Sequence, residues 1–128
     1  MKKKIAILLP YKDQYINEIA GSASIWVKDF NKNSLHKKNT IIFGNTKKID
    51  DLITKENYIN INFNESSLLS KNKNYVNKFI NIIRKKKFKL IEIHNRPSYL
   101  LQIDSAISNL DFILVFHNNP LSLAGSQK

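Results

Sequence analysis

Two segments late in the chain share one pattern, a run of apolar residues that leads directly into His-Asn-x-Pro. The first is IEIHNRP, which ends at Pro97, and the second is ILVFHNNP, which ends at Pro120. Each run is short and nearly all apolar, as expected for a parallel strand covered on both faces, and proline ends a strand because it has no N–H to donate. The pattern predicts strands over residues 90–93 and 112–116.

Helical spacing of apolar side chains fills the segment between these strands, SYLLQIDSAISNL, which predicts a helix. The same alternation of strand and helix runs through the rest of the chain. Polar residues over 64–74 predict a loop. The further predicted strands cover residues 5–9, 40–43 and 58–63, the helices cover 22–31 and 75–87, and a helical turn covers 49–53.

This alternation predicts an α/β domain. Right-handed crossovers give a Rossmann-like parallel sheet with strand order 3-2-1-4-5 and helices on both faces. The order reverses between the first and fourth strands, and ligands of such sheets bind beyond the carboxyl ends of the strands at that reversal. We therefore expect Gly21, in the loop after the first strand, to open onto one crevice with the two His-Asn pairs.

The length of 128 residues suits a single domain, 1–128. The final segment, NNPLSLAGSQK, reads as a loop that enters a helix, and no further element follows it in the sequence. We expect a Rossmann-like domain that lacks its last elements. An exposed apolar patch near Leu121 and Leu123 should result.

Basic residues outnumber acidic ones by 21 to 10. Only Arg84 and Arg96 are arginine, the residue that most often reads bases and clamps phosphates, and the lysines are spread over nearly every loop. This distribution favours solvated surface, with attraction to an anionic membrane surface or a phosphorylated substrate as the second interpretation. A nucleic-acid-binding domain is an alternative suggested by charge alone, and it would need a basic stripe on one face.

The absence of cysteine fits a reducing compartment. The start, MKKKIAILLP, has an apolar run of only five residues before Pro10, too short for a secretory core or a membrane span. We expect a cytoplasmic protein that can lie peripherally at the inner face of the membrane.

Gly21 and Ser22, at the start of the first predicted helix, are the nearest approach to a phosphate cradle. Glycine lets a ligand come close to the backbone, and the free amides of a helix N-terminus favour an anion. No GxGxxG follows the first strand and no GxxxxGK[ST] is present, which removes the main support for dinucleotide and P-loop sites. A glycine and a serine that simply begin a helix are the plainer alternative.

His94 and His117 are predicted to bind hydroxyl groups, with Asn95, Asn118 and Asn119 as neighbouring amides. A zinc site needs three or four ligands, and the third histidine, His36, falls in a distant lysine-rich turn, so we expect no metal. A plainer interpretation stays open, because histidine and asparagine in loops also cap turns before proline.

Charged residues near these loops add further candidates. Arg96 could grip a phosphate or a carboxylate, or it could be an ordinary surface charge. Asp13 and Glu18, in the loop after the first strand, could act as a base or bind a hydroxyl. A flavodoxin-like or receiver-like regulatory domain is another alternative. A receiver needs acidic residues at the ends of the first and third strands, where this chain has LP and FN instead.

With KKKIAILLP, then AGSAS, LIEIHNRP and ILVFHNNPLSLAGS, the chain resembles the amino-terminal half of family 4 glycosyltransferases, the group 1 enzymes with the GT-B fold. The resemblance covers essentially the whole chain. Members use an amino-terminal acceptor lobe and a carboxy-terminal lobe for the nucleotide-sugar donor. It implies a retaining enzyme that moves a sugar onto a hydroxyl of a lipopolysaccharide, capsule or glycolipid precursor, with no cofactor.

Residue by residue, the resemblance implies that Gly21 and Ser22 approach the donor phosphate and that His117 is catalytic, facing the transferred sugar. It places His94, Asn95, Arg96 and Asn118 on the acceptor side. Many members have two glycines where this chain has Ala20-Gly21. The donor lobe is not within these residues, so we expect the 128-residue chain alone to transfer no sugar.

Overall fold

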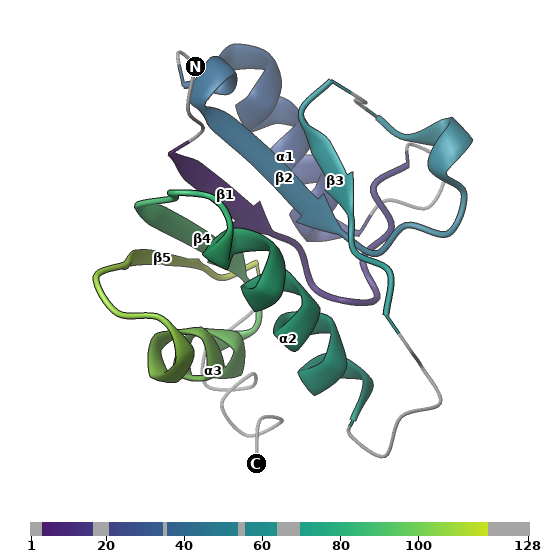
Figure 1. Ribbon diagram of the computed structural model, residues 1–128. Coiled ribbons are helices and arrows are strands. Elements are labelled where there is room, and N and C mark those ends of the chain that lie inside the picture. Colours follow the sequence, from purple (N-terminus) through teal and green to yellow (C-terminus); the bar gives the residue numbers. More distant parts are fainter. Residues whose placement is uncertain (1–3, 17–20, 35, 54–55, 64–69, 118–128) are drawn as a thin grey trace.

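The computed structural model describes residues 4–16, 21–34, 36–53, 56–63 and 70–117 (Figure 1). Strands and helices alternate along these segments, as the sequence predicts. Two 3-10 turns, Lys37–Asn39 and Ile49–Asp51, lie on either side of the second strand. The strands are β1 (Ile5–Leu8), β2 (Thr40–Gly44), β3 (Tyr58–Asn60), β4 (Leu90–His94) and β5 (Asp111–Val115), and the helices are α1 (Ser22–Asn33), α2 (Lys71–Arg84) and α3 (Pro97–Ala106).

The five strands form one parallel sheet in the order β3-β2-β1-β4-β5. This confirms the predicted order and the reversal between β1 and β4. In register, Ile5 lies opposite Thr40 of β2 on one side and Leu90 of β4 on the other. The carboxyl ends of β1, β2 and β4 therefore meet at one edge of the sheet.

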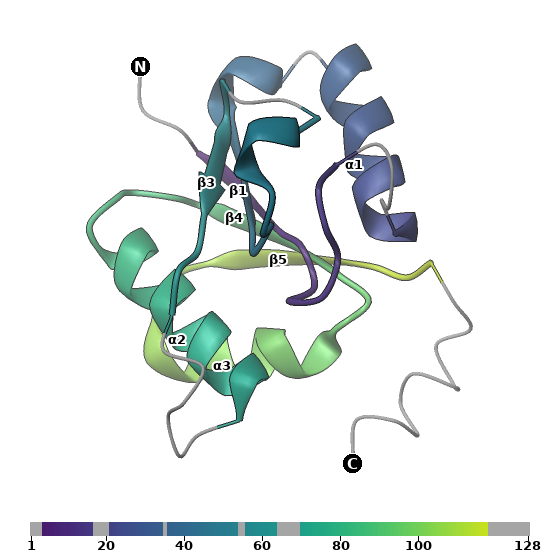
Figure 2. The same cartoon turned by 90° about the vertical axis from the view of Figure 1, so that its right-hand side faces the viewer.

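Helices cover both faces of the sheet, as predicted. Successive side chains of a strand point to opposite faces. Ile7 belongs to the apolar cluster with Val27 of α1, whereas Leu8 belongs to the larger cluster with Phe79 of α2 and Ile103 of α3. Figure 2 shows α1 on one side of the sheet and α2 and α3 on the other. The helices thus hold the strand ends, and the loops that follow them, in place from both sides.

Helix α2 corrects the predicted loop over 64–74, because it begins at Lys71 inside that range. Ser70 caps it, with its Oγ accepting a hydrogen bond from the Lys73 amide at 3.1 Å. The first turn is polar because it is exposed, so apolar spacing appears only from Tyr75 onward. The helix also ends at Arg84, earlier than the predicted residue 87.

The two strands of the His-Asn-x-Pro segments differ in burial. Ile91 and Ile93 of β4 are fully buried, as predicted for a strand covered on both faces. For β5 that prediction is wrong, because Ile113 and Leu114 are 44% and 37% exposed. β5 is an edge strand whose outer part no described helix covers. The patch predicted near residues 121–123 lies outside the described residues.

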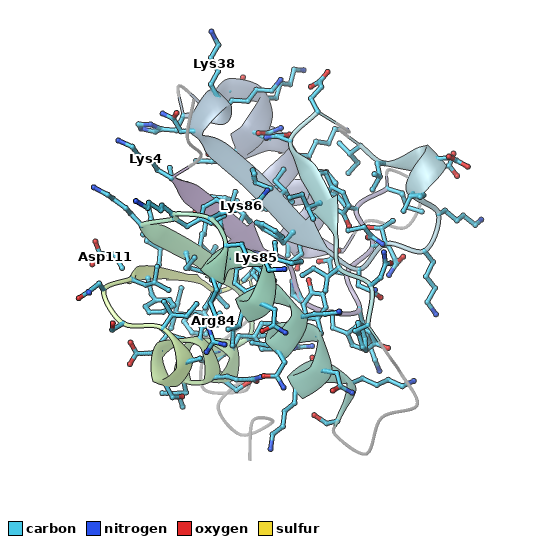
Figure 3. The ribbon with its side chains drawn as sticks, in the orientation of Figure 1. Lys4, Lys38, Arg84, Lys85, Lys86 and Asp111 are labelled. Atoms are coloured by element: carbon cyan, nitrogen blue, oxygen red, sulfur yellow. The ribbon has the colours of Figure 1, made fainter. Side chains whose placement is uncertain are left out.

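Exposed lysines surround the opposite, amino-terminal edge of the sheet (Figure 3). Lys4 precedes β1, and the lysines that follow α2, 85–87, precede β4. The Lys89 amide donates to the Lys4 carbonyl at 2.9 Å, so the two segments adjoin. Within the described segments, no helix combines the length and apolar character needed to cross a bilayer.

Candidate functional site

The two His-Asn pairs meet at the carboxyl edge of the sheet. His94, the last residue of β4, pairs in register with Val115 of β5, and His117 follows two residues later. The Asn95 amide donates to the Val115 carbonyl at 2.9 Å, and the Asn95 Oδ1 accepts from the His117 amide at 2.7 Å. The structure therefore brings together the two histidines that the sequence singles out.

Asn95 shapes the turn after β4. Its φ of 57° lies in the left-handed region, which asparagine tolerates better than most residues. The side chain is buried, and its Oδ1 is used to hold the backbone of His117. Asn95, predicted on the acceptor side, thus positions the start of the loop after β5.

A continuous chain of hydrogen bonds links three side chains of β4 and the β5 loop. The Oε2 of Glu92 lies 2.8 Å from Nε2 of His94, and Nδ1 of His94 lies 2.8 Å from Nε2 of His117. Glu92 is 7% exposed and His94 is 0% exposed, whereas His117 is half-buried. The hydrogen-bond chain therefore runs from the buried interior of the sheet to the half-buried His117.

The direction of these bonds follows from the chemistry of Glu92. An ionised carboxylate has only acceptors, so the proton in its bond with His94 lies on Nε2. When His94 carries its one proton on Nε2, its Nδ1 accepts from Nε2 of His117. Nδ1 of His117 is left unprotonated, and no described residue hydrogen-bonds to it. This arrangement leaves a hydrogen-bond acceptor on a half-buried side chain, of the kind that a ligand hydroxyl requires.

Burial and three titratable neighbours shift the pKa of His117. Burial lowers its pKa, and the nearby His94 lowers it further, while the carboxylates of Asp13 and Glu92 act in the opposite direction. The indole of Trp26 on α1 lies edge-on to His117, with ring centroids 6.3 Å apart, and 5.2 Å from the His94 ring. A lowered pKa keeps His117 neutral, and therefore able to accept a hydrogen bond, at neutral pH.

Asp13 occupies the start of α1, where the sequence predicts a donor phosphate. One carboxylate oxygen accepts from the Gly21 amide at 3.0 Å and from the Ser24 hydroxyl at 2.6 Å, and the other accepts from the Ser24 amide at 3.3 Å. A Cβ at residue 21 would lie within 2.8–2.9 Å of this carboxylate, so a side chain there would displace the carboxylate from its hydrogen bonds. Ser22 is exposed at the first position of the helix.

The remaining predicted residues lie elsewhere. Arg96 is half-buried at the start of α3, where its Nη1 donates to the Asn95 carbonyl at 3.1 Å. His36 precedes the turn before β2, at the opposite edge of the sheet from His94 and His117. Asn118, Asn119 and Glu18 lie outside the described residues. Among the described side chains, no three His, Cys, Asp or Glu residues are grouped to hold a metal ion.

Sequence reasoning missed Glu92 and Trp26. A signal for Glu92 was present, because a charged residue two positions before His94 in an otherwise apolar strand must face the same side and needs a buried partner. Trp26 gave no such signal, since an aromatic residue on a helix face is usually part of the core.

Comparison with protein-family models, curated proteins and solved structures finds no match to this chain.

Proposed function

We propose that this chain is the acceptor-side lobe of a GT-B glycosyltransferase of the retaining type. Such an enzyme moves a sugar from a nucleotide-sugar donor to a hydroxyl acceptor, here a lipopolysaccharide, capsule or glycolipid precursor. The observation that carries the proposal is the Glu92–His94–His117 hydrogen-bond chain, which ends on the half-buried His117 at the carboxyl edge of the sheet. The same two histidine segments carry the resemblance to family 4 enzymes.

In this proposal His117 is the catalytic contact. Its Nδ1 accepts a hydrogen bond from a hydroxyl of the transferred sugar, and this orients the sugar at the point where α1 and the β5 loop face each other. Positive charge develops on the transferred sugar in the transition state, and the hydrogen bond from its hydroxyl polarises His117. The negative charge of Glu92, relayed through His94, stabilises that polarised state. Glu92 and His94 are positioning residues, because both are buried.

The proposal assigns the donor phosphate differently from the simple family pattern. The Asp13 carboxylate already accepts from the Gly21 and Ser24 amides, and a phosphate at the same amides would be repelled by it. Gly21 and Ser22 therefore lie on the donor side as the Asp13-capped start of α1, and in this proposal they make no direct contact with the phosphate. The neutralising cations for the phosphates would come from the donor lobe.

The experiment uses sugar binding and sugar transfer together. The 128-residue chain is titrated with a panel of simple glycosides and followed by NMR. The proposal expects the side-chain resonances of His117 and the Trp26 indole to shift while those of His36 do not. The chain alone should release no nucleoside diphosphate from any nucleotide sugar. Turnover by the chain alone, or shifts confined to His36 across the whole panel, would overturn the proposal.

A further inference from the structure

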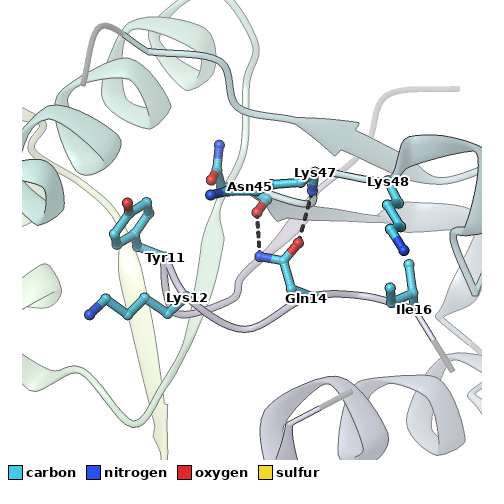
Figure 4. A pocket seen from close by; sticks show the side chains of 7 residues that line it. All are labelled: Tyr11, Lys12, Gln14, Ile16, Asn45, Lys47 and Lys48. Atoms are coloured by element: carbon cyan, nitrogen blue, oxygen red, sulfur yellow. Dashed lines mark hydrogen bonds between the residues drawn. The ribbon is translucent and has the colours of Figure 1, made fainter. Parts of the chain in front are cut away.

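A hollow lies at the carboxyl edge of the sheet, on the β1–β2–β3 side and away from the histidines. It is a cavity of about 410 Å³ between the loop after β1 and the segment after β2 (Figure 4). The residues around it are Tyr11, Lys12, Gln14, Ile16, Asn45, Lys47 and Lys48.

Hydrogen bonds fix the two segments that form this cavity. Gln14 joins them, because its Nε2 donates to the Asn45 carbonyl at 3.0 Å and its Oε1 accepts from the Lys47 amide at 2.8 Å (Figure 4). The Tyr15 amide also donates to Oγ1 of Thr46 at 3.1 Å. The backbone that carries the lysines is therefore preorganised, and only their side chains need to be ordered by a ligand.

Among the described residues, three lysines and no carboxylate line the cavity. Lys12, Lys47 and Lys48 are exposed, and none forms an ion pair with another described residue. Like charges gathered around one hollow repel each other, and a bound anion relieves that repulsion. Lysine is a common phosphate ligand that acts as a point charge, so it suits a phosphate group that can turn.

A second cavity of about 410 Å³ adjoins the first and shares Asn45 and Lys47 with it. It adds Asn60, Asn62 and Phe63 from the end of β3 and the residues after it. The Asn60 amide holds the Thr46 backbone and the Asn62 side chain. Asn62 is exposed beside the half-buried Phe63, and an amide next to an aromatic ring suits a polyhydroxylated ring, which needs polar partners and an apolar face. Together the two cavities, which we call the lysine groove, combine a place for an anion with a place for a sugar.

We propose that the lysine groove binds a phosphorylated sugar, with the phosphate among Lys12, Lys47 and Lys48 and the ring against Asn60, Asn62 and Phe63. The phosphate can belong to a free sugar phosphate or to the headgroup of a lipid. Use of this ligand as the acceptor rests on the proposed function, whereas the binding itself does not.

The test compares two triple variants with the same change in net charge. K12A/K47A/K48A removes the lysines of the groove, and K85A/K86A/K87A removes three exposed lysines after α2, at the opposite edge of the sheet. The probes are glucose 6-phosphate and glucose, followed by NMR shifts of the backbone amides of residues 45–48. Vesicles of phosphatidylcholine with and without phosphatidylinositol phosphate distinguish a lipid headgroup from a free sugar phosphate.

We expect glucose 6-phosphate to bind more tightly than glucose and to shift these amides. The groove variant should lose about tenfold or more in affinity, because each lost contact to a charged group is substantial, while the control variant changes little. Equal losses in both variants would reduce the effect to net charge and overturn the proposal. So would equal binding of glucose, or shifts confined to other regions. Thermal melts of both variants check that each is folded.

Failure of the proposed function would look different. If the lysine groove binds glucose 6-phosphate as expected but glycosides leave His117 unshifted, the groove stands and the sugar-transfer proposal falls. If His117 responds and the groove does not, the reverse holds.

Discussion

The two His-Asn-x-Pro segments show how one sequence pattern serves two purposes. In the first, His94 is fully buried, both of its ring nitrogens are engaged, and Asn95 holds a left-handed turn. In the second, His117 is half-buried, and one ring nitrogen is without a partner among the described residues. The difference follows from the strands, because β4 lies inside the sheet whereas β5 lies at its edge. The buried His94 therefore holds its neighbours in place, whereas His117 at the sheet edge keeps a ring nitrogen for a ligand.

The largest expected effect is on stability. His94→Ala should lower the free energy of unfolding by about 3 kcal/mol, because it leaves the buried Glu92 carboxylate without its partner. His117→Ala should lower it far less, since that side chain is only half-buried. Chemical denaturation of both variants measures the contrast. Equal losses would mean that the two copies play the same structural part.

The second prediction concerns sugar transfer by the proposed glycosyltransferase, assayed with its donor lobe present. His117→Ala should reduce kcat by about 10²-fold or more, as expected for loss of one positioned interaction in the transition state. His36→Ala is the matched control, because His36 lies at the opposite edge of the sheet. Steady-state kinetics decide the matter. If both variants lower kcat only slightly and to a similar extent, His117 is not catalytic and only closes the turn after β5.

A third prediction separates two roles of Asn95, the left-handed backbone conformation and the hydrogen bond to the His117 amide. Asn95→Ala should cost about 1–2 kcal/mol of stability, because alanine is strained at a φ of 57°. Asn95→Gly accepts that φ but still loses the hydrogen bond to the His117 amide. Glycine should therefore be the more stable variant by thermal melt, and both should alter the His117 resonances. If alanine is as stable as glycine, the left-handed turn carries no strain.

A fourth prediction tests the direction of the hydrogen-bond chain. Long-range proton–nitrogen NMR at about pH 8, above the ordinary histidine pKa of about 6.5, should show Nδ1 of His117 unprotonated. Glu92→Gln should mix the two tautomers, because an amide can donate as well as accept. Asp111→Asn, which removes a carboxyl group from the exposed start of β5, should leave the tautomer unchanged. A protonated Nδ1 in the unaltered chain would contradict the assignment.

The smallest expected effect is on the pH dependence of stability. Because the pKa of His117 is lowered in the folded protein, its contribution to stability is present above the unfolded pKa of about 6.5 and is lost as pH falls through the folded pKa. Unfolding free energies measured between about pH 8 and pH 4 should fall less in His117→Ala than in the unaltered chain. His36→Ala again provides the control. An unchanged slope in His117→Ala would show that its pKa is ordinary.

The order of the sheet could be predicted because apolar runs mark each strand and right-handed crossovers leave few arrangements. Three features could not. The first turn of α2 is polar because it faces solvent, so no apolar spacing marks Lys71 as its start. The exposure of Ile113 depends on what packs over β5, which its own sequence does not specify. The capping of α1 by Asp13 spans eight residues of loop, a distance at which no local rule operates.

The contact between Asp13 and Gly21 has a consequence for the history of the sequence. A side chain at residue 21 would collide with the Asp13 carboxylate, and loss of that carboxylate would leave the Gly21 and Ser24 amides without their acceptor. A side chain at residue 21 therefore requires the Asp13 carboxylate to move or to be replaced. Among descendants of a common ancestor, residues larger than glycine at position 21 should be found together with a replacement of Asp13, whereas glycine is compatible with either residue at position 13.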